Sequence, residues 1–150
     1  MRPFSRREAL ALGAGTVAFT VLASNGLQAA AKDAEAEIMK FTGGKTPVAG
    51  KIAIELPEIA ENGNTVPLTF TVESPMTEAD HVTDVLVLAD GNPRPGVATF
   101  RFSPMSGKAE ASTRIRLATT QNIVVIAKTK SGQFLSEQKL VKVTIGGCGG

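Results

Sequence analysis

Between residues 52 and 145, apolar residues recur at every second position in short runs that are separated by turn signals. The run 66–72 is the clearest, because Val66, Leu68, Phe70 and Val72 alternate with polar residues or proline. Such alternation is typical of half-buried antiparallel strands. Asn-Gly, Ser-Pro, Asp-Gly-Asn-Pro and Ser-Gly sequences lie between the runs and favour turns. Strands are predicted at 52–56, 66–72, 82–88, 97–102, 109–117, 122–129 and 133–145.

About seven short strands at this spacing predict an all-β fold, an immunoglobulin-like antiparallel β-sandwich. The chain has no tryptophan and a single cysteine, which excludes the antibody variety of that fold. An up-and-down barrel is the weaker alternative. Before the strands, the run Asp33–Lys40 predicts a short helix, with Asp33 as its N-cap and Gly43-Gly44 at its end.

The first 31 residues have the features of an export signal. Arg6 and Arg7 precede an uncharged stretch, and alanines at 29–31 offer a cleavage site. The paired arginines and weakly apolar core favour the twin-arginine route over the general secretory route. However, Ala9 stands where that route usually has a large apolar residue. We therefore expect a signal peptide at 1–31, a single compact β-sandwich domain at 32–145 and a periplasmic protein.

The charge balance gives no support for a nucleic-acid partner once the signal is removed. The chain has 16 Lys and Arg and 14 Asp and Glu residues, and its pI is about 8.9. The first 31 residues hold three of the arginines and one glutamate, so 13 basic and 13 acidic residues remain. A net charge near zero does not indicate binding to a polyanion.

The chain ends in the segment 146–150, Gly-Gly-Cys-Gly-Gly, whose Cys148 is the only cysteine. Glycine packs poorly and loses much conformational freedom on ordering, so this segment is predicted to be a swinging arm in which Gly146, Gly147, Gly149 and Gly150 provide flexibility. With no neighbouring base or cation in the arm, the thiol should have a pKa near the ordinary value of about 8.5. These features favour Cys148 as the covalent attachment point for a substrate.

The remaining residues offer little enzyme chemistry. The sequence contains no Cys-x-x-Cys, P-loop or dinucleotide motif, and it has one histidine, His81. We therefore predict no catalytic residue, cofactor or metal, and a structural or surface role for His81. A Cys148–His81 pair and a copper site made of Met76, Met105 and His81 are the weaker alternatives. Arg114 and Arg116 should face away from the core.

Several other interpretations of the tail remain open. Cys148 could be a tolerated surface thiol, or it could link two copies of an interaction domain through a disulfide. The domain could also act alone as a thiol-dependent sulfurtransferase. The terminal Gly149-Gly150 resembles the end of ubiquitin-like sulfur carriers, but their activation requires ATP, which an exported protein would not meet. Prenylation is excluded because only two residues follow the cysteine.

Several segments resemble the SoxY family of thiosulfate-oxidation carriers: 56–67, 74–77, 80–82, 89–93 and 113–118. The clearest match is Val141–Gly150, which includes the whole tail. The resemblance implies a heterodimer with SoxZ and sulfur intermediates carried on Cys148. It also implies that SoxAX couples thiosulfate to the cysteine, that SoxB removes sulfate, and that SoxCD in some organisms oxidises the remaining sulfur. Because joining a thiol to thiosulfate removes two electrons, the oxidant must be a partner.

Overall fold

Alternating residues form nine strands in the part of the chain that the computed structural model describes, residues 30–147. A helix covers residues 30–42, and a short 3-10 helix, η1, covers Pro104–Ser106. The strands are β1 (Val48–Ala49), β2 (Ile52–Glu55), β3 (Ile59–Asn62), β4 (Val66–Val72), β5 (Val82–Ala89), β6 (Gly96–Arg101), β7 (Ala109–Ile115), β8 (Gln121–Thr129) and β9 (Phe134–Ile145).

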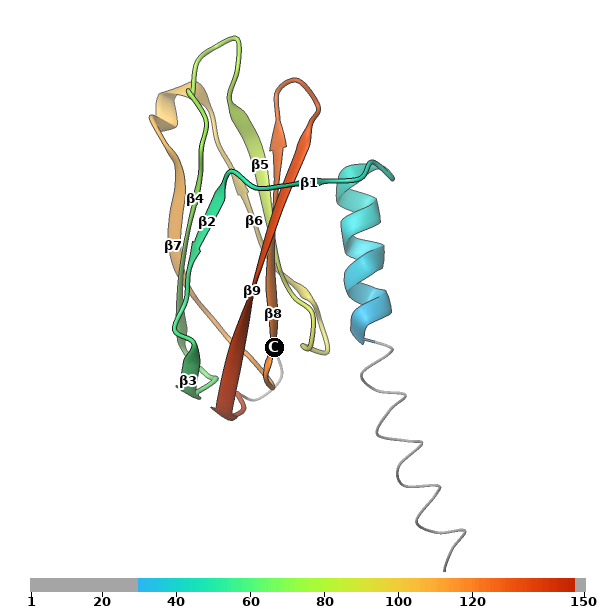
Figure 1. The fold of residues 1–150 in the computed structure, drawn as a ribbon, viewed down its shortest axis with the longest axis vertical. Coiled ribbons are helices and arrows are strands. Elements are labelled where there is room, and N and C mark those ends of the chain that lie inside the picture. The colour runs from blue at the N-terminus through green and yellow to red at the C-terminus, as the bar shows by residue number, and fades with distance from the viewer. Residues whose placement is uncertain (1–29, 148–150) are drawn as a thin grey trace, which may run out of the picture.

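The strands form two sheets that face each other (Figure 1). The smaller sheet has the order β2-β4-β7, and the larger has the order β1-β9-β8-β5-β6 with β3 also paired to β9. Neighbouring strands are antiparallel except β1 and β3, which run parallel to β9. The predicted all-β sandwich is therefore confirmed, with two short parallel strands added at its edge.

The two additional strands were not predicted from the sequence. β1 has only two residues, and β3 follows Pro57 and ends at Asn62, where the sequence analysis placed a turn. Both strands are too short to show an alternating pattern, and their pairing with β9 depends on contacts distant in sequence. The seven predicted strands all form, with ends shifted by at most a few residues.

The core lies between the inner faces of the two sheets. Phe70 of β4 is fully buried, and its ring makes edge-on contacts with Phe100 and Phe102 at centroid distances of 5.2 and 6.3 Å. Across from it, Val85 and Val87 of β5 are also fully buried. With one cysteine in the chain, this packed interior supplies the stability that disulfides give to many exported domains.

The N-terminal helix packs on the outer face of the large sheet, where Figure 1 shows it beside β8 and β9. Phe41 meets Phe134 of β9 edge-on at 5.8 Å, next to a second apolar cluster that contains Leu86 and Ile126. Because β5 and β8 are covered on both faces, their buried residues run consecutively there.

The helix ends at the predicted glycines, but it does not begin at the predicted residue, Asp33. Gly43 and Gly44 have φ angles of +64° and +85°, and the Gly44 amide donates to the Met39 carbonyl at 3.3 Å. This bond closes the last turn of the helix. The prediction that Asp33 is the N-cap is wrong, because residues 30–32 are already helical. No helix within residues 30–147 is long and apolar enough to cross a membrane.

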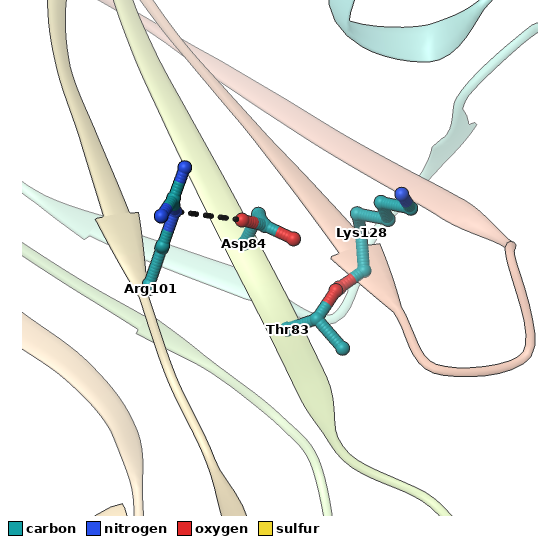
Figure 2. A network of polar contacts seen from close by, with 4 residues as sticks. All are labelled: Thr83, Asp84, Arg101 and Lys128. Atoms are coloured by element: carbon teal, nitrogen blue, oxygen red, sulfur yellow. Dashed lines mark hydrogen bonds and ion pairs between the residues drawn. The ribbon is translucent and has the colours of Figure 1, made fainter.

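Figure 2 shows polar contacts across the outer part of the large sheet. The Arg101 side chain of β6 lies 3.7 Å from the Asp84 carboxylate of β5, and the Thr83 hydroxyl donates to the Lys128 carbonyl of β8 at 3.2 Å. The Arg101 side chain is 88% exposed, so solvent screens this ion pair and it contributes little stability.

Candidate functional site: the base of the cysteine arm

The last strand extends beyond its neighbour β8 at the end that leads to the tail. Its final cross-strand partner on β8 is Gln121, which lies opposite Val141. Beyond this point the Val143 amide donates to the Thr120 hydroxyl at 2.9 Å, and β3 pairs with β9 as far as Ile145. The strand that carries the tail is therefore held on both sides up to its last residue.

Three separate segments meet where β9 ends. The Gly63 amide donates to the Ile145 carbonyl at 2.7 Å, and the Leu117 amide donates to the Gly63 carbonyl at 2.8 Å. The Gly147 amide then donates to the Leu117 carbonyl at 2.8 Å. We call the backbone of Gly63, Leu117 and Ala118 around the two glycines of the tail the arm clamp.

Close backbone contact explains why glycine occupies three positions in this region. A Cβ atom on Gly63 would lie 2.2 Å from the Leu117 carbonyl oxygen, and one on Gly146 would lie 2.2 Å from the Ala118 carbonyl oxygen. A Cβ atom on Gly147 would lie 2.8 Å from the Gly63 carbonyl oxygen. No side chain fits at such distances without movement of the backbone.

The arm clamp changes the role expected of Gly146 and Gly147. The sequence analysis assigned both glycines to a flexible arm that begins after Ile145, but Gly147 is buried and its amide is hydrogen-bonded. The packed domain thus continues through Gly147. Cys148, Gly149 and Gly150 lie outside the described residues, so their predicted roles as attachment point and flexible links stay predictions.

His81 has a structural role, as the sequence analysis favoured. Its side chain is buried, its Nδ1 atom lies 2.8 Å from the Thr77 carbonyl oxygen, and its own carbonyl accepts the Lys130 amide. Lys130 follows the far end of β8, whereas the arm clamp adjoins its start, and strand geometry puts these ends about 25 Å apart. Gly147, the last described residue, therefore lies at the opposite end of β8 from His81, which argues against the Cys148–His81 pair.

Within residues 30–147, the other residues singled out in the sequence lie in different environments. Met76 packs in the core, whereas Met105 is 96% exposed, so the two are not presented as a pair of ligands. Arg114 and Arg116 are exposed, as predicted. Among residues 30–147 no group of three or more histidine, cysteine, aspartate or glutamate side chains could hold a metal ion.

Gly63, Leu117 and Ala118 were not predicted as site residues. Gly63 stands in an Asn-Gly sequence that looks like an ordinary turn, and Leu117 and Ala118 contribute backbone atoms, which leave no mark on residue type. The signal available from the sequence was a pair of glycines directly after a strand, which is also how a flexible segment begins.

The fold and the site together define a class of protein: a β-sandwich domain whose last strand leads, through two tightly packed glycines, into a tail that contains the only cysteine of the sequence. A family model described as the sulfur oxidation protein SoxY matches residues 38–148. The chain therefore belongs to the SoxY family. The comparison with curated proteins gave no match.

Among solved structures, the chain is similar to the sulfur carrier protein SoxY from Chlorobium limicola f thiosulfatophilum. The two are 32% identical with a TM-score of 0.65, and the match covers 76% of this chain and 94% of that chain. A superoxide reductase (neelaredoxin) from Ignicoccus hospitalis matches with a TM-score of 0.56 at 16% identity, over 63% of this chain and 80% of that one. A superoxide reductase from Nanoarchaeum equitans matches with a TM-score of 0.51 at 14% identity, over 64% of this chain and 100% of that one. The likeness to the reductases shows the fold alone.

Proposed function

We propose that this protein is a carrier that holds thiosulfate-derived sulfur covalently on Cys148 and presents it to the enzymes of a sulfur-oxidation system. The observation that carries the proposal is the family match, which extends to Cys148 itself. The solved relative at 32% identity is described as a sulfur carrier. The arm clamp supports the same function, because it gives the only cysteine of the chain a defined point of departure.

The chemistry of loading requires a partner that accepts electrons. A bond forms between the Cys148 sulfur and the outer sulfur of thiosulfate, and one proton and two electrons are released. With a single cysteine, the chain can form no internal disulfide that would accept these electrons. By family resemblance, SoxAX would accept them, SoxB would hydrolyse the product to release sulfate, and SoxCD would oxidise the remaining sulfur where it is present.

A second protein, SoxZ, is the proposed permanent partner, and the outer surface of β3 and β9 suits its docking. Ile59 of β3 and Leu140 of β9 are 58% and 52% exposed, although both are large apolar residues. They line one pocket together with Glu58, Lys139 and Lys142. Exposed apolar side chains rimmed by charges are typical of protein interfaces.

We also propose that the protein works in the periplasm after removal of residues 1–31. This proposal depends on the paired arginines, the weakly apolar stretch and the alanines that follow it. We further propose joint export, in which the protein folds with a SoxZ that lacks its own signal and carries it across the membrane. Replacing Arg6 and Arg7 by lysine should then keep both proteins in the cytoplasm, as measured by cell fractionation. Export of SoxZ in that strain would contradict joint export.

Replacing Cys148 by serine separates the carrier from a disulfide-linked interaction domain. The carrier proposal predicts that cells with Cys148→Ser lose thiosulfate oxidation while the protein and its SoxZ complex persist. Loss of a covalent dimer with unchanged thiosulfate oxidation would favour the interaction domain. Turnover of thiosulfate by the purified protein alone would instead favour a sulfurtransferase.

A further inference from the structure

The segment that supplies the arm clamp has no regular secondary structure of its own. Residues 116–120 connect β7 to β8, and the carbonyls of Leu117 and Ala118 in this segment contact Gly147 and Gly146. A connecting segment of this kind needs other contacts to hold one conformation. Buried side chains from two neighbouring segments supply these contacts.

Asn92, from the turn between β5 and β6, holds this segment on both sides of Leu117. Its side chain is in the interior, and the residue is only 1% exposed. The Nδ2 atom donates to the Arg116 carbonyl at 2.8 Å, and the Oδ1 atom accepts the Ala118 amide at 2.9 Å. One amide side chain thus fixes the two peptide groups that flank the residue whose carbonyl binds Gly147.

Gln121 completes the arrangement from the start of β8. It is 4% exposed, and its Nε2 atom donates to Asn92 Oδ1 at 2.8 Å and to the Thr119 carbonyl at 2.9 Å. Its Oε1 atom accepts the Gly91 amide at 2.8 Å. The nitrogen and oxygen atoms of both buried amides have partners, and buried amides without them are costly.

We propose that the buried Asn92–Gln121 pair is a positioning site for the carrier arm: it fixes residues 116–118, which clamp Gly146 and Gly147 and so set where Cys148 leaves the domain. Buried apolar side chains could fill this space without any need for hydrogen-bond partners. A fully satisfied polar pair instead selects one conformation of the segment. This inference rests on the proposed carrier function of Cys148.

Amide hydrogen exchange tests the positioning without any sulfur chemistry. In Asn92→Ala, the Gly147 amide should exchange about tenfold faster or more, because the carbonyl that it binds is no longer held. The matched control is Phe41→Ala, which removes a packing contact on the outer face of the large sheet and leaves the segment 116–121 intact. If the exchange rate of the Gly147 amide increases no more in Asn92→Ala than in Phe41→Ala, the proposal is overturned.

Loading of thiosulfate by the partner proteins then links positioning to function. In Asn92→Ala the rate of loading should fall about tenfold, while a small thiol reagent such as dithionitrobenzoate should react with Cys148 as fast as in the wild type. Equal loading in Asn92→Ala and wild type would overturn the functional half of the proposal. If Cys148 is never loaded in any variant, the carrier function fails, and the exchange experiment still decides the positioning.

A second variant keeps the proposal testable if Asn92→Ala does not fold. Gln121→Ala removes the other half of the pair and should raise Gly147 exchange in the same direction. Because the two side chains act through one network, the double variant should show less than the sum of the two single effects. Full additivity would show that the two side chains act separately, and it would contradict a single positioning site.

Discussion

At the scale of single residues, Gly63 allows the β3–β4 turn to pack closely against the base of the tail because it has no side chain. Its backbone joins Ile145 to Leu117 through two hydrogen bonds, and a Cβ atom there would lie 2.2 Å from one carbonyl oxygen. A contact of this kind cannot be relieved by rotation of a side chain, because the atoms on both sides belong to the backbone. The residue thus couples the stability of the β3–β4 turn to the position of the arm.

Gly63→Ala should therefore lower the free energy of unfolding by roughly 1–3 kcal/mol, since the backbone must shift to admit the methyl group. Gly96→Ala is the matched control, because a Cβ atom on Gly96 would meet nothing within 4 Å. Chemical denaturation of the two variants gives the comparison. Equal stabilities for the two variants would contradict the close contact at Gly63.

The sequence predicts Cys148 as the attachment point, which stays a prediction, and it did not reveal what surrounds the base of the arm. A single cysteine among glycines is visible in the residue types themselves. In contrast, the arm clamp is made of backbone atoms from residues 63, 117 and 118, which only the pairing of distant segments brings together. The glycines at 146 and 147 suggested freedom, whereas their environment shows that they are needed for close packing.

At the scale of elements, the N-terminal helix is a separate layer on the outer face of the large sheet. Its contact depends on Phe41, which meets Phe134 edge-on, with Ile38 packed beside the same cluster. The helix could be predicted from Ala and Glu residues and its glycine end. Its docking could not be predicted, because the sheet residues that receive it, such as Leu86 and Ile126, also fit a strand that is buried on one face only.

Phe41→Ala should destabilise the protein by roughly 1–3 kcal/mol, because it removes an aromatic contact and leaves apolar residues of β5 and β8 partly uncovered. Met39→Ala is a suitable control, since Met39 is on the same helix and is 64% exposed. Thermal unfolding of both variants measures the difference. A loss of stability as large in Met39→Ala as in Phe41→Ala would be inconsistent with docking through Phe41.

The seven strands predicted from the sequence all form, and the two that were missed are the short parallel strands β1 and β3. Alternation in 66–72 is regular because β4 lies in the small sheet, with one face toward the core. β3 pairs with β9 through only a few residues, and its Asn62 looks like part of a turn. Missing β3 also meant missing the base of the arm, since β3 holds the last residues of β9 and leads directly into Gly63.

At the scale of the whole molecule, the buried His81 and the arm clamp lie at opposite ends of the sandwich. Figure 1 shows β3 and the end of β9 at one end of the sandwich and the β8–β9 hairpin at the other. His81 packs near that hairpin through its bond to Lys130, whereas the arm clamp lies at the opposite end. The exposed apolar residues of β3 and β9 then place the proposed SoxZ surface beside the strand that carries the arm.

If SoxZ docks on this surface as proposed, Leu140→Asp should weaken the complex by roughly tenfold or more, because a charge would be buried in an apolar contact. The folded domain should tolerate the change, since the side chain is half exposed already. Met105→Asp, at a residue that is 96% exposed on η1, provides the control. Affinity of purified SoxZ for both variants can be measured by calorimetry, and equal affinities would exclude this surface as the docking site.

The carrier function of Cys148 is tested most directly by the mass of the C-terminal peptide from cells grown on thiosulfate. Trypsin cleaves after Lys142, so the peptide from Val143 to Gly150 contains the only cysteine. The carrier proposal predicts that part of this peptide has added mass from sulfur or a thiosulfonate group, that reduction removes the addition, and that Cys148→Ser never shows it. A peptide found only as free thiol, or only as a disulfide between two copies, would contradict the proposal.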